Sequence, residues 1–130
     1  LLIALCASQS MQAAESKATI AWRRIALTRD FYSEGACAGD IDQDGNKDIV
    51  AGPFIYYGPE FVTKSSLYPP QPFSINGYSN NFFSFIHDID RDGKEDILVI
   101  GFPGAEAFWY RNPGASVRSE SAWERFLAYP

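Results

Sequence analysis

Residues 40–49 read Asp-Ile-Asp-Gln-Asp-Gly-Asn-Lys-Asp-Ile, and residues 88–97 read Asp-Ile-Asp-Arg-Asp-Gly-Lys-Glu-Asp-Ile. The two runs start 48 residues apart and share Asp at positions 1, 3, 5 and 9, Gly at position 6 and Ile at positions 2 and 10. A spacing of about 20 to 50 residues is typical of repeat architectures. The sequence therefore predicts two copies of one structural unit.

Short β-branched and aromatic runs, separated by Gly, Pro, Asn and Ser, lie on both sides of each acidic run and are typical of strands. The expected strands are 36–39, 48–51, 54–57 and 61–68 in the first unit and 82–87, 96–100, 107–110 and 123–128 in the second, with one further strand at 20–27. Four strands in a unit of about 45 to 50 residues match the size of a β-propeller blade. We therefore predict an all-β fold of two four-stranded blades of an incomplete propeller.

Composition and charge narrow the functional classes. The chain has 130 residues, of which 46% are hydrophobic, as expected for one globular domain, while its 15% of aromatic residues is unusually high and favours short strands over long helices. Its net charge is −5; the two acidic runs carry −3 each and the rest of the chain +1, so the acidity is local and a broad nucleic-acid-binding surface is not expected. No apolar run reaches the roughly 18 residues of a transmembrane helix.

The chain opens with an apolar run, Leu1–Ala7, followed by small and polar residues up to Ala14. An apolar stretch that ends in small residues resembles the core and cleavage zone of a secretory signal peptide. We interpret residues 1–14 as a signal-peptide remnant and expect a secreted, periplasmic or cell-surface protein, with a short buried strand or helical turn as the alternative. A lipoprotein signal at Cys6 fits less well, because Leu5 stands where a small residue is required.

The arrangement of acids in each run is suited to holding a cation. Alternate Asp residues in a tight loop point their carboxylates inward, and Gly at position 6 permits the sharp turn. Carboxylates this close repel one another unless a cation lies between them, and oxygen-only ligands favour Ca²⁺. The predicted ligands of two Ca²⁺ sites, with Asn46 and Lys94 acting through their backbone carbonyls, are Asp40, Asp42, Asp44, Asn46, Asp48, Asp88, Asp90, Asp92, Lys94 and Asp96.

Two alternatives exist for the acidic runs. The first is an acidic surface turn, since Asp and Gly are common in turns of any kind. The second is an EF-hand, which requires an acid at position 12, where this chain has Ala51 and Val99. An EF-hand also requires flanking helices, whereas residues 49–51 and 97–100 have the composition of strands. The EF-hand therefore fails on both counts.

The pattern Asp-x-Asp-x-Asp-Gly-x-x-Asp-Ile, followed by Gly52-Pro53 in one copy and Gly101-Phe102-Pro103 in the other, resembles the FG-GAP repeat, also called VCBS. That repeat builds the amino-terminal β-propeller of integrin α subunits and occurs in many secreted bacterial proteins. The run from Trp109 to Gly114 is similar to a strand ending of the bacterial members.

By this resemblance, residues 15–130 are FG-GAP/VCBS repeats, with one blade at about 31–68 and a second at about 79–129. The resemblance implies that the eight Asp residues of the two runs bind calcium. Two blades cannot close a ring, so the copy number departs from the family pattern. We expect a calcium-binding secreted scaffold that mediates interaction with an extracellular protein or carbohydrate; a non-catalytic propeller portion of a larger secreted enzyme is the alternative.

No catalytic constellation is evident, so we do not expect an enzyme in this segment. His87 is the only histidine and stands beside Asp88, where a structural role is expected. The paired acids could serve as glycosidase carboxylates, but a metal explains their packing on a Gly turn better. If residues 1–14 are removed, Cys37 is the only thiol, and in its small apolar run we expect a core residue rather than a nucleophile.

A long link, residues 69–81, joins the two predicted units and is rich in Pro, aromatic and amide side chains. Both acidic runs are expected to connect the first strand of a unit to the second. In a meander of four strands, the link between the units then lies at the end of the sheets opposite to the acidic runs. Flat apolar surface combined with amide hydrogen bonding suits recognition. The predicted ligand-binding residues are Phe73, Asn76, Tyr78 and Asn80, the alternative being that Phe73 and Tyr78 only anchor the link to the sheet.

Overall fold

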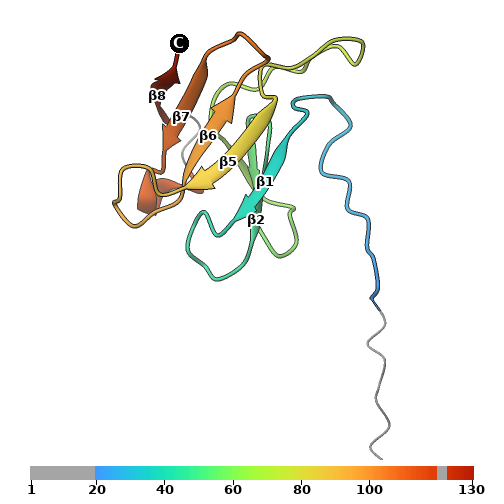
Figure 1. Cartoon of the computed structure of the whole chain (residues 1–130). Helices are drawn as coiled ribbons and strands as arrows, with labels where there is room; N and C mark the ends of the chain where they lie inside the picture. The colour runs from blue at the N-terminus through green and yellow to red at the C-terminus, as the bar shows by residue number, and fades with distance from the viewer. Residues whose placement is uncertain (1–19, 120–122) are drawn as a thin grey trace, which may run out of the picture.

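The computed structural model describes residues 20–119 and 123–130, which form two four-stranded antiparallel sheets (Figure 1). The first sheet contains β1 (Ala36–Gly39), β2 (Asp48–Ala51), β3 (Phe54–Tyr56) and β4 (Lys64–Ser66). The second contains β5 (Phe83–His87), β6 (Asp96–Ile100), β7 (Ala107–Arg111) and β8 (Glu124–Tyr129). Each sheet keeps its strands in chain order, and a 3₁₀ turn, η1 (Gly114–Ser116), follows β7.

The all-β prediction is confirmed, and the strands on either side of both acidic runs begin and end close to where the sequence predicts. The expected strand 61–68 is too long, because the chain enters β4 only at Lys64. Before that point the Phe61 N–H donates to the Tyr57 carbonyl (2.9 Å) in a turn. Phe61 has a φ of 57°, which is incompatible with a strand.

The predicted strand at 20–27 is wrong, because these residues form neither strand nor helix. Residues 22–27 resemble residues 123–128 in composition, and both runs begin with Trp, yet only the second run contains a strand, β8. Trp123 is only 5% exposed and its backbone N–H donates to the Leu67 carbonyl (2.9 Å), whereas Trp22 is 92% exposed. Among the described residues no strand pairs with residues 22–27, so a similar composition stays irregular there.

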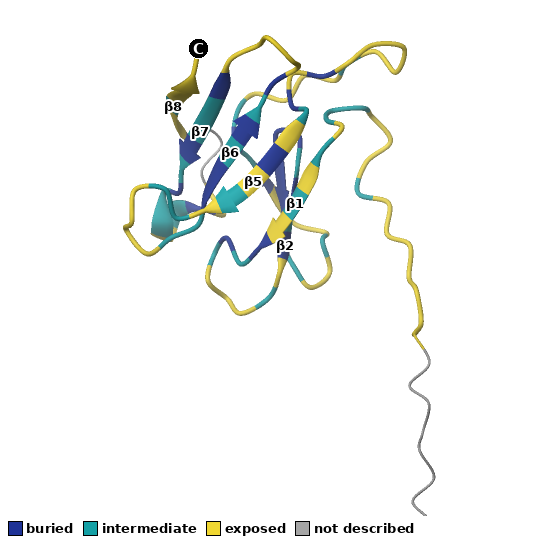
Figure 2. Cartoon of the chain, viewed as in Figure 1, coloured by how far each residue is buried: buried dark blue, intermediate teal, exposed yellow. Residues whose placement is uncertain are grey.

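One hydrophobic core lies between the two sheets, as the dark strands of Figure 2 indicate. Val50 and Ile55 are cross-strand neighbours in the first sheet, and both are fully buried. Ile97 and Tyr110 are cross-strand neighbours in the second sheet and join the same cluster. Side chains of a strand alternate between its two sides, so each sheet contributes one side to this core.

The sides of the sheets that face away from the core differ. On the first sheet, Tyr32 packs edge-on against Phe54, with ring centroids 5.0 Å apart. On the second sheet, Phe83 and Phe85 of β5 are 52% and 49% exposed. The second sheet therefore carries the more open apolar surface.

The connections are distributed as predicted. The acidic runs form the β1–β2 and β5–β6 turns, at one end of the two sheets, and the link 69–81 lies at the other end (Figure 1). There the Phe73 N–H donates to the Phe31 carbonyl (2.8 Å), and link residues share a cavity with the β2–β3 and β6–β7 turns. The candidate cation loops and the candidate recognition link are thus on opposite ends of the molecule.

Candidate metal centre

We call residues 40–48 the first loop and residues 88–96 the second loop. Gly45 and Gly93, at position 6, have φ angles of 88° and 86°, the left-handed conformation that glycine adopts without strain. Gln43 and Arg91, both at position 4, are also left-handed, with φ angles of 59° and 62°. The two loops therefore follow the same backbone path, and the position-4 feature is one that the sequence pattern did not reveal.

The Asp at position 9 is the most buried acid of each loop. Asp48 and Asp96 both have a fully buried side chain. One oxygen of Asp48 accepts from the Ile41 N–H (2.9 Å) and the other from the Gly58 N–H (2.8 Å). Burial raises the pKa of Asp48, while these two hydrogen bonds act in the opposite direction. This carboxylate therefore holds the loop against the β3–β4 connection.

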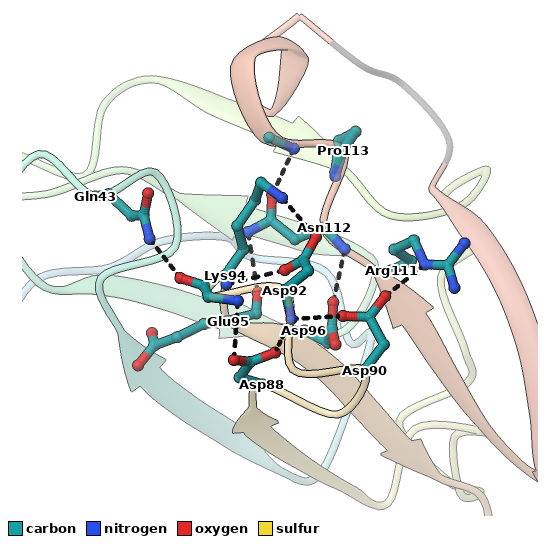
Figure 3. Close-up of polar contacts among 12 residues, drawn as sticks. Gln43, Asp88, Asp90, Asp92, Lys94, Glu95, Asp96, Arg111, Asn112 and Pro113 are labelled. Atoms are coloured by element: carbon teal, nitrogen blue, oxygen red, sulfur yellow. Dashed lines mark hydrogen bonds and ion pairs between the residues drawn. The ribbon is translucent and has the colours of Figure 1, made fainter.

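The second loop repeats the arrangement (Figure 3). One oxygen of Asp96 accepts from the Ile89 N–H (2.9 Å) and the other from the Asn112 N–H (2.9 Å). Asn112 thus occupies the place that Gly58 has in the first unit. Because these backbone N–H groups are shielded from water, a carboxylate that accepts two of them stabilises the loop before any ligand is considered.

The acids at positions 1, 3 and 9 converge in both loops. Asp40, Asp42 and Asp48 each offer one carboxylate oxygen, and these three atoms lie within 4.8 Å of one another. Asp88, Asp90 and Asp96 do the same in the second loop. Three convergent carboxylate oxygens are suited to a hard cation. Both clusters could therefore hold a metal ion.

A polar atom without a protein partner lies in the first cluster. The Oδ2 atom of Asp40 accepts from the Gly45 N–H (3.0 Å), whereas its Oδ1 atom is buried and has no hydrogen-bond partner among the described residues. A buried charged oxygen without a partner costs free energy. A cation between the carboxylates would compensate this oxygen, so the residues present fit a bound metal.

The acid at position 5 lies outside both clusters. Asp44 accepts from the Arg118 guanidinium (2.9 Å), and Arg118 also pairs with Asp42. Asp92 pairs instead with Lys94 of its own loop. A backbone hydrogen bond from Asn46 lowers the pKa of Asp44, and the hydrogen bond from the Lys94 side chain lowers the pKa of Asp92. Metal binding by Asp44 and Asp92 stays a prediction.

The residues at position 7 take part in the loops through their backbone N–H groups. The Asn46 N–H donates to Asp44 (2.8 Å), and the Lys94 N–H donates to Asp92 (3.0 Å). These hydrogen bonds close matching turns between positions 5 and 7. The use of the Asn46 and Lys94 carbonyls as ligands stays a prediction.

The two loops are joined by side chains that sequence reasoning missed. The Asn112 amide donates to the Ile41 carbonyl of the first loop (2.9 Å) and to the Glu95 carbonyl of the second (3.0 Å). The Gln43 amide donates to the Gly93 carbonyl (2.8 Å; Figure 3). The signal for Asn112 was its place in the Trp109–Gly114 run, but nothing in that run shows which backbone groups it contacts.

The predicted ligand-binding residues of the link do not stay together. Phe73 and Asn80 line the cavity at the end opposite the loops. Asn76 is exposed, and its N–H donates to Ser74 Oγ (3.3 Å). Tyr78 stacks at a tilt on Phe102, with ring centroids 4.9 Å apart, away from the cavity. A binding role for these four residues stays a prediction.

Cys37 and His87, whose possible catalytic roles were weighed from the sequence, lie in different surroundings. Cys37 is half-buried rather than fully buried and packs against the core. Burial raises the pKa of its thiol to about 11, so little thiolate forms at neutral pH. His87 is exposed at the end of β5, as the cross-strand neighbour of Asp96. The expected structural role of His87 stays a prediction.

No protein-family model, no curated protein and no solved structure matches this chain. Within residues 20–119 and 123–130, no helix is long and apolar enough to cross a membrane. The predicted signal-peptide remnant, residues 1–14, lies outside the described residues.

Proposed function

We propose that this chain is a calcium-binding scaffold of the FG-GAP (VCBS) type, in which the two sheets are consecutive blades of a β-propeller. In this proposal the protein is secreted, and it presents its surface to an extracellular protein or carbohydrate. The observation that carries the proposal is that both loops gather three carboxylate oxygens within 4.8 Å on the same backbone path. An isolated acidic turn gives no reason for two copies of such a cluster.

Calcium is the cation that the donor set favours. All the converging atoms are carboxylate oxygens, which hard cations prefer to soft ones. Mg²⁺ demands near-ideal octahedral geometry, whereas Ca²⁺ accepts six to eight oxygens in a flexible arrangement. In the proposed site, Asp40, Asp42 and Asp48 hold one ion, and Asp88, Asp90 and Asp96 hold the other, with the acids at position 5 and the carbonyls at position 7 completing each shell.

The test is a comparison of thermal unfolding in excess calcium and in EGTA. Extracellular sites of this kind bind at about 10⁻⁴ to 10⁻³ M, so millimolar calcium should raise the melting temperature. Calorimetric titration should give two sites in the wild type and one each in Asp42→Asn and Asp90→Asn. Asp30→Asn, an exposed acid outside both loops, is the matched control and should keep both sites. A melting temperature that calcium leaves unchanged would contradict the proposal.

A further inference from the structure

A cavity of about 440 Å³ lies between the link, the β2–β3 turn and the core-facing side of the second sheet. Its volume falls within the roughly 300 to 1,000 Å³ of small-molecule sites. Aromatic side chains from four different parts of the chain line it; they are Tyr32, Tyr68, Phe73, Phe108 and Tyr110. The cavity therefore offers flat apolar walls at the end of the molecule far from the acidic loops.

The polar lining of the cavity is balanced in charge and in hydrogen-bonding capacity. Glu106 and Arg125 supply one negative and one positive charge, and Gln71 and Asn80 supply amides that both donate and accept. All four side chains belong to exposed residues, so they can reach a ligand that enters from solvent. The Arg125 guanidinium lies 4.3 Å from the centre of the Phe108 ring, which holds it at the cavity.

The walls are fixed before any ligand binds. The fully buried Asn81 amide donates to the Gly52 carbonyl (3.1 Å) and to the Tyr68 hydroxyl (3.1 Å), and its oxygen accepts from Ser84 (2.8 Å). The rings of Tyr68 and Tyr110 lie 5.3 Å apart. Burial raises the pKa of both hydroxyls, that of Tyr110 to about 12, so they remain neutral at physiological pH.

We propose that this cavity binds a neutral carbohydrate of one or two sugar rings. A sugar has an apolar face that packs on aromatic rings and a rim of hydroxyls that both donate and accept hydrogen bonds. A wholly apolar ligand would leave the charges and amides of the cavity unpaired. A strongly charged ligand would meet no excess of opposite charge, because Glu106 and Arg125 offset each other.

This inference rests on the proposed function, since it chooses carbohydrate over protein as the partner. The probes are glucose, galactose, mannose, N-acetylglucosamine, cellobiose and lactose at millimolar concentration, with glucuronate, glucosamine and hexane-1,6-diol as charged and apolar comparisons. Saturation-transfer NMR with the full chain in millimolar calcium should detect at least one neutral sugar. The charged sugars and the diol should give weaker signals.

Variants then place the binding in the cavity. Gln71→Ala and Glu106→Gln change exposed side chains, so folding should be unaffected while affinity for the bound sugar falls about three- to tenfold. Phe85→Ala is the matched control, because Phe85 is an exposed ring of the second sheet on the side facing away from the core. It should leave the affinity unchanged.

Three results would overturn the inference. The first is that no neutral sugar gives a signal, and the second is that a charged sugar or the diol binds best. The third is that sugar affinity is the same in wild type, Gln71→Ala and Glu106→Gln. Any of these, together with a calcium-dependent melting temperature, would reject the carbohydrate cavity and leave the calcium scaffold standing; loss of the calcium effect would reject the scaffold itself.

Discussion

The first and second loops share their carboxylates but not the groups around them. In both, the Asp at position 9 accepts two backbone N–H groups, one from position 2 and one from the connection after the third strand of the sheet. That second N–H belongs to Gly58 in the first unit and to Asn112 in the second. The repeated pattern therefore fixes how the Asp at position 9 is held, whereas the residues that surround it differ between the two units.

The difference between Gly58 and Asn112 has a steric origin. A Cβ at Gly58 would lie 2.2 Å from the Lys47 carbonyl oxygen, so no side chain fits there. At Asn112 a side chain fits, and its amide reaches the carbonyls of both Ile41 and Glu95. The contact between the two loops is therefore supplied mainly by the second unit.

The largest expected effect comes from removing the carboxylate at position 9. Asp48→Ala and Asp96→Ala each leave two shielded backbone N–H groups without an acceptor, which should cost about 3 kcal/mol of the free energy of unfolding. Asp96→Ala should cost more than Asp48→Ala, because it also releases Asn112. Urea unfolding in EGTA measures this without calcium, and the exposed Asp44→Ala is the control. Equal losses in all three variants would show that the Asp at position 9 has no special role in holding either loop.

The next effect concerns the contact between the loops. Asn112→Gly gives the second unit the residue of the first, and it removes the two hydrogen bonds that the Asn112 amide donates and the one that its oxygen accepts from the Gly114 N–H; Asn112 is only 3% exposed. We expect a loss of about 2 kcal/mol in the free energy of unfolding by urea. Asn112→Asp keeps the Oδ1 acceptor for Gly114 but cannot donate to either carbonyl, so it should be destabilised as well, which assigns the loss to the two donated hydrogen bonds. If Asn112→Gly unfolds like wild type, the two loops are not held together by this amide.

A smaller effect is expected from the basic side chain that pairs with the acids of the first loop. Arg118 comes from the segment after η1 and pairs with Asp42 and Asp44 of the first loop. A bound calcium ion must compete with it, so Arg118→Ala should tighten calcium binding at the first loop about two- to fivefold. Calorimetry in the Asp90→Asn background isolates that loop. Arg24→Ala, an exposed arginine outside both loops, is the control for net charge and should not change the affinity.

The smallest effect is a titration difference. The Lys94 side chain lowers the pKa of Asp92, whereas the backbone N–H of Asn46 is the main cause of the lowered pKa of Asp44. A lowered carboxyl pKa favours folding above the unfolded value and loses that contribution as pH falls through the folded value. Lys94→Gln should therefore raise the pKa of Asp92 toward its ordinary value and leave that of Asp44 unchanged. Carboxyl-carbon NMR in EGTA measures both, and a shift at Asp44 would show that the loops titrate together.

Sequence reasoning succeeded where the signal is local. The Asp-Gly turn and the apolar strands beside it fall within about ten residues, so β1, β2, β5 and β6 were predictable together with the convergence of the acids. It failed where a partner decides the outcome. Trp22 pairs with no strand in the part of the chain that the structure describes, and Arg118 reaches an acid 76 residues away in the chain. Burial of Asp48 was equally invisible, because it follows from hydrogen bonds to the Ile41 and Gly58 N–H groups that the Asp-Gly pattern does not specify.

The two sheets pack with different sides toward the shared core. Ile49 and Ile97 occupy the same position of the repeat. In the second sheet Ile97 faces the core, but in the first sheet the next residue, Val50, faces it. The two units therefore contact each other through opposite sides of the repeated sheet, so the contact is not symmetric. Leu98, the counterpart of Val50, lies with Phe85 on the surface that faces away from the core. On the corresponding side of the first sheet, Phe54 and Tyr56 are only 7% and 2% exposed, so a further unit of this shape would find an open apolar surface at the second sheet and not at the first.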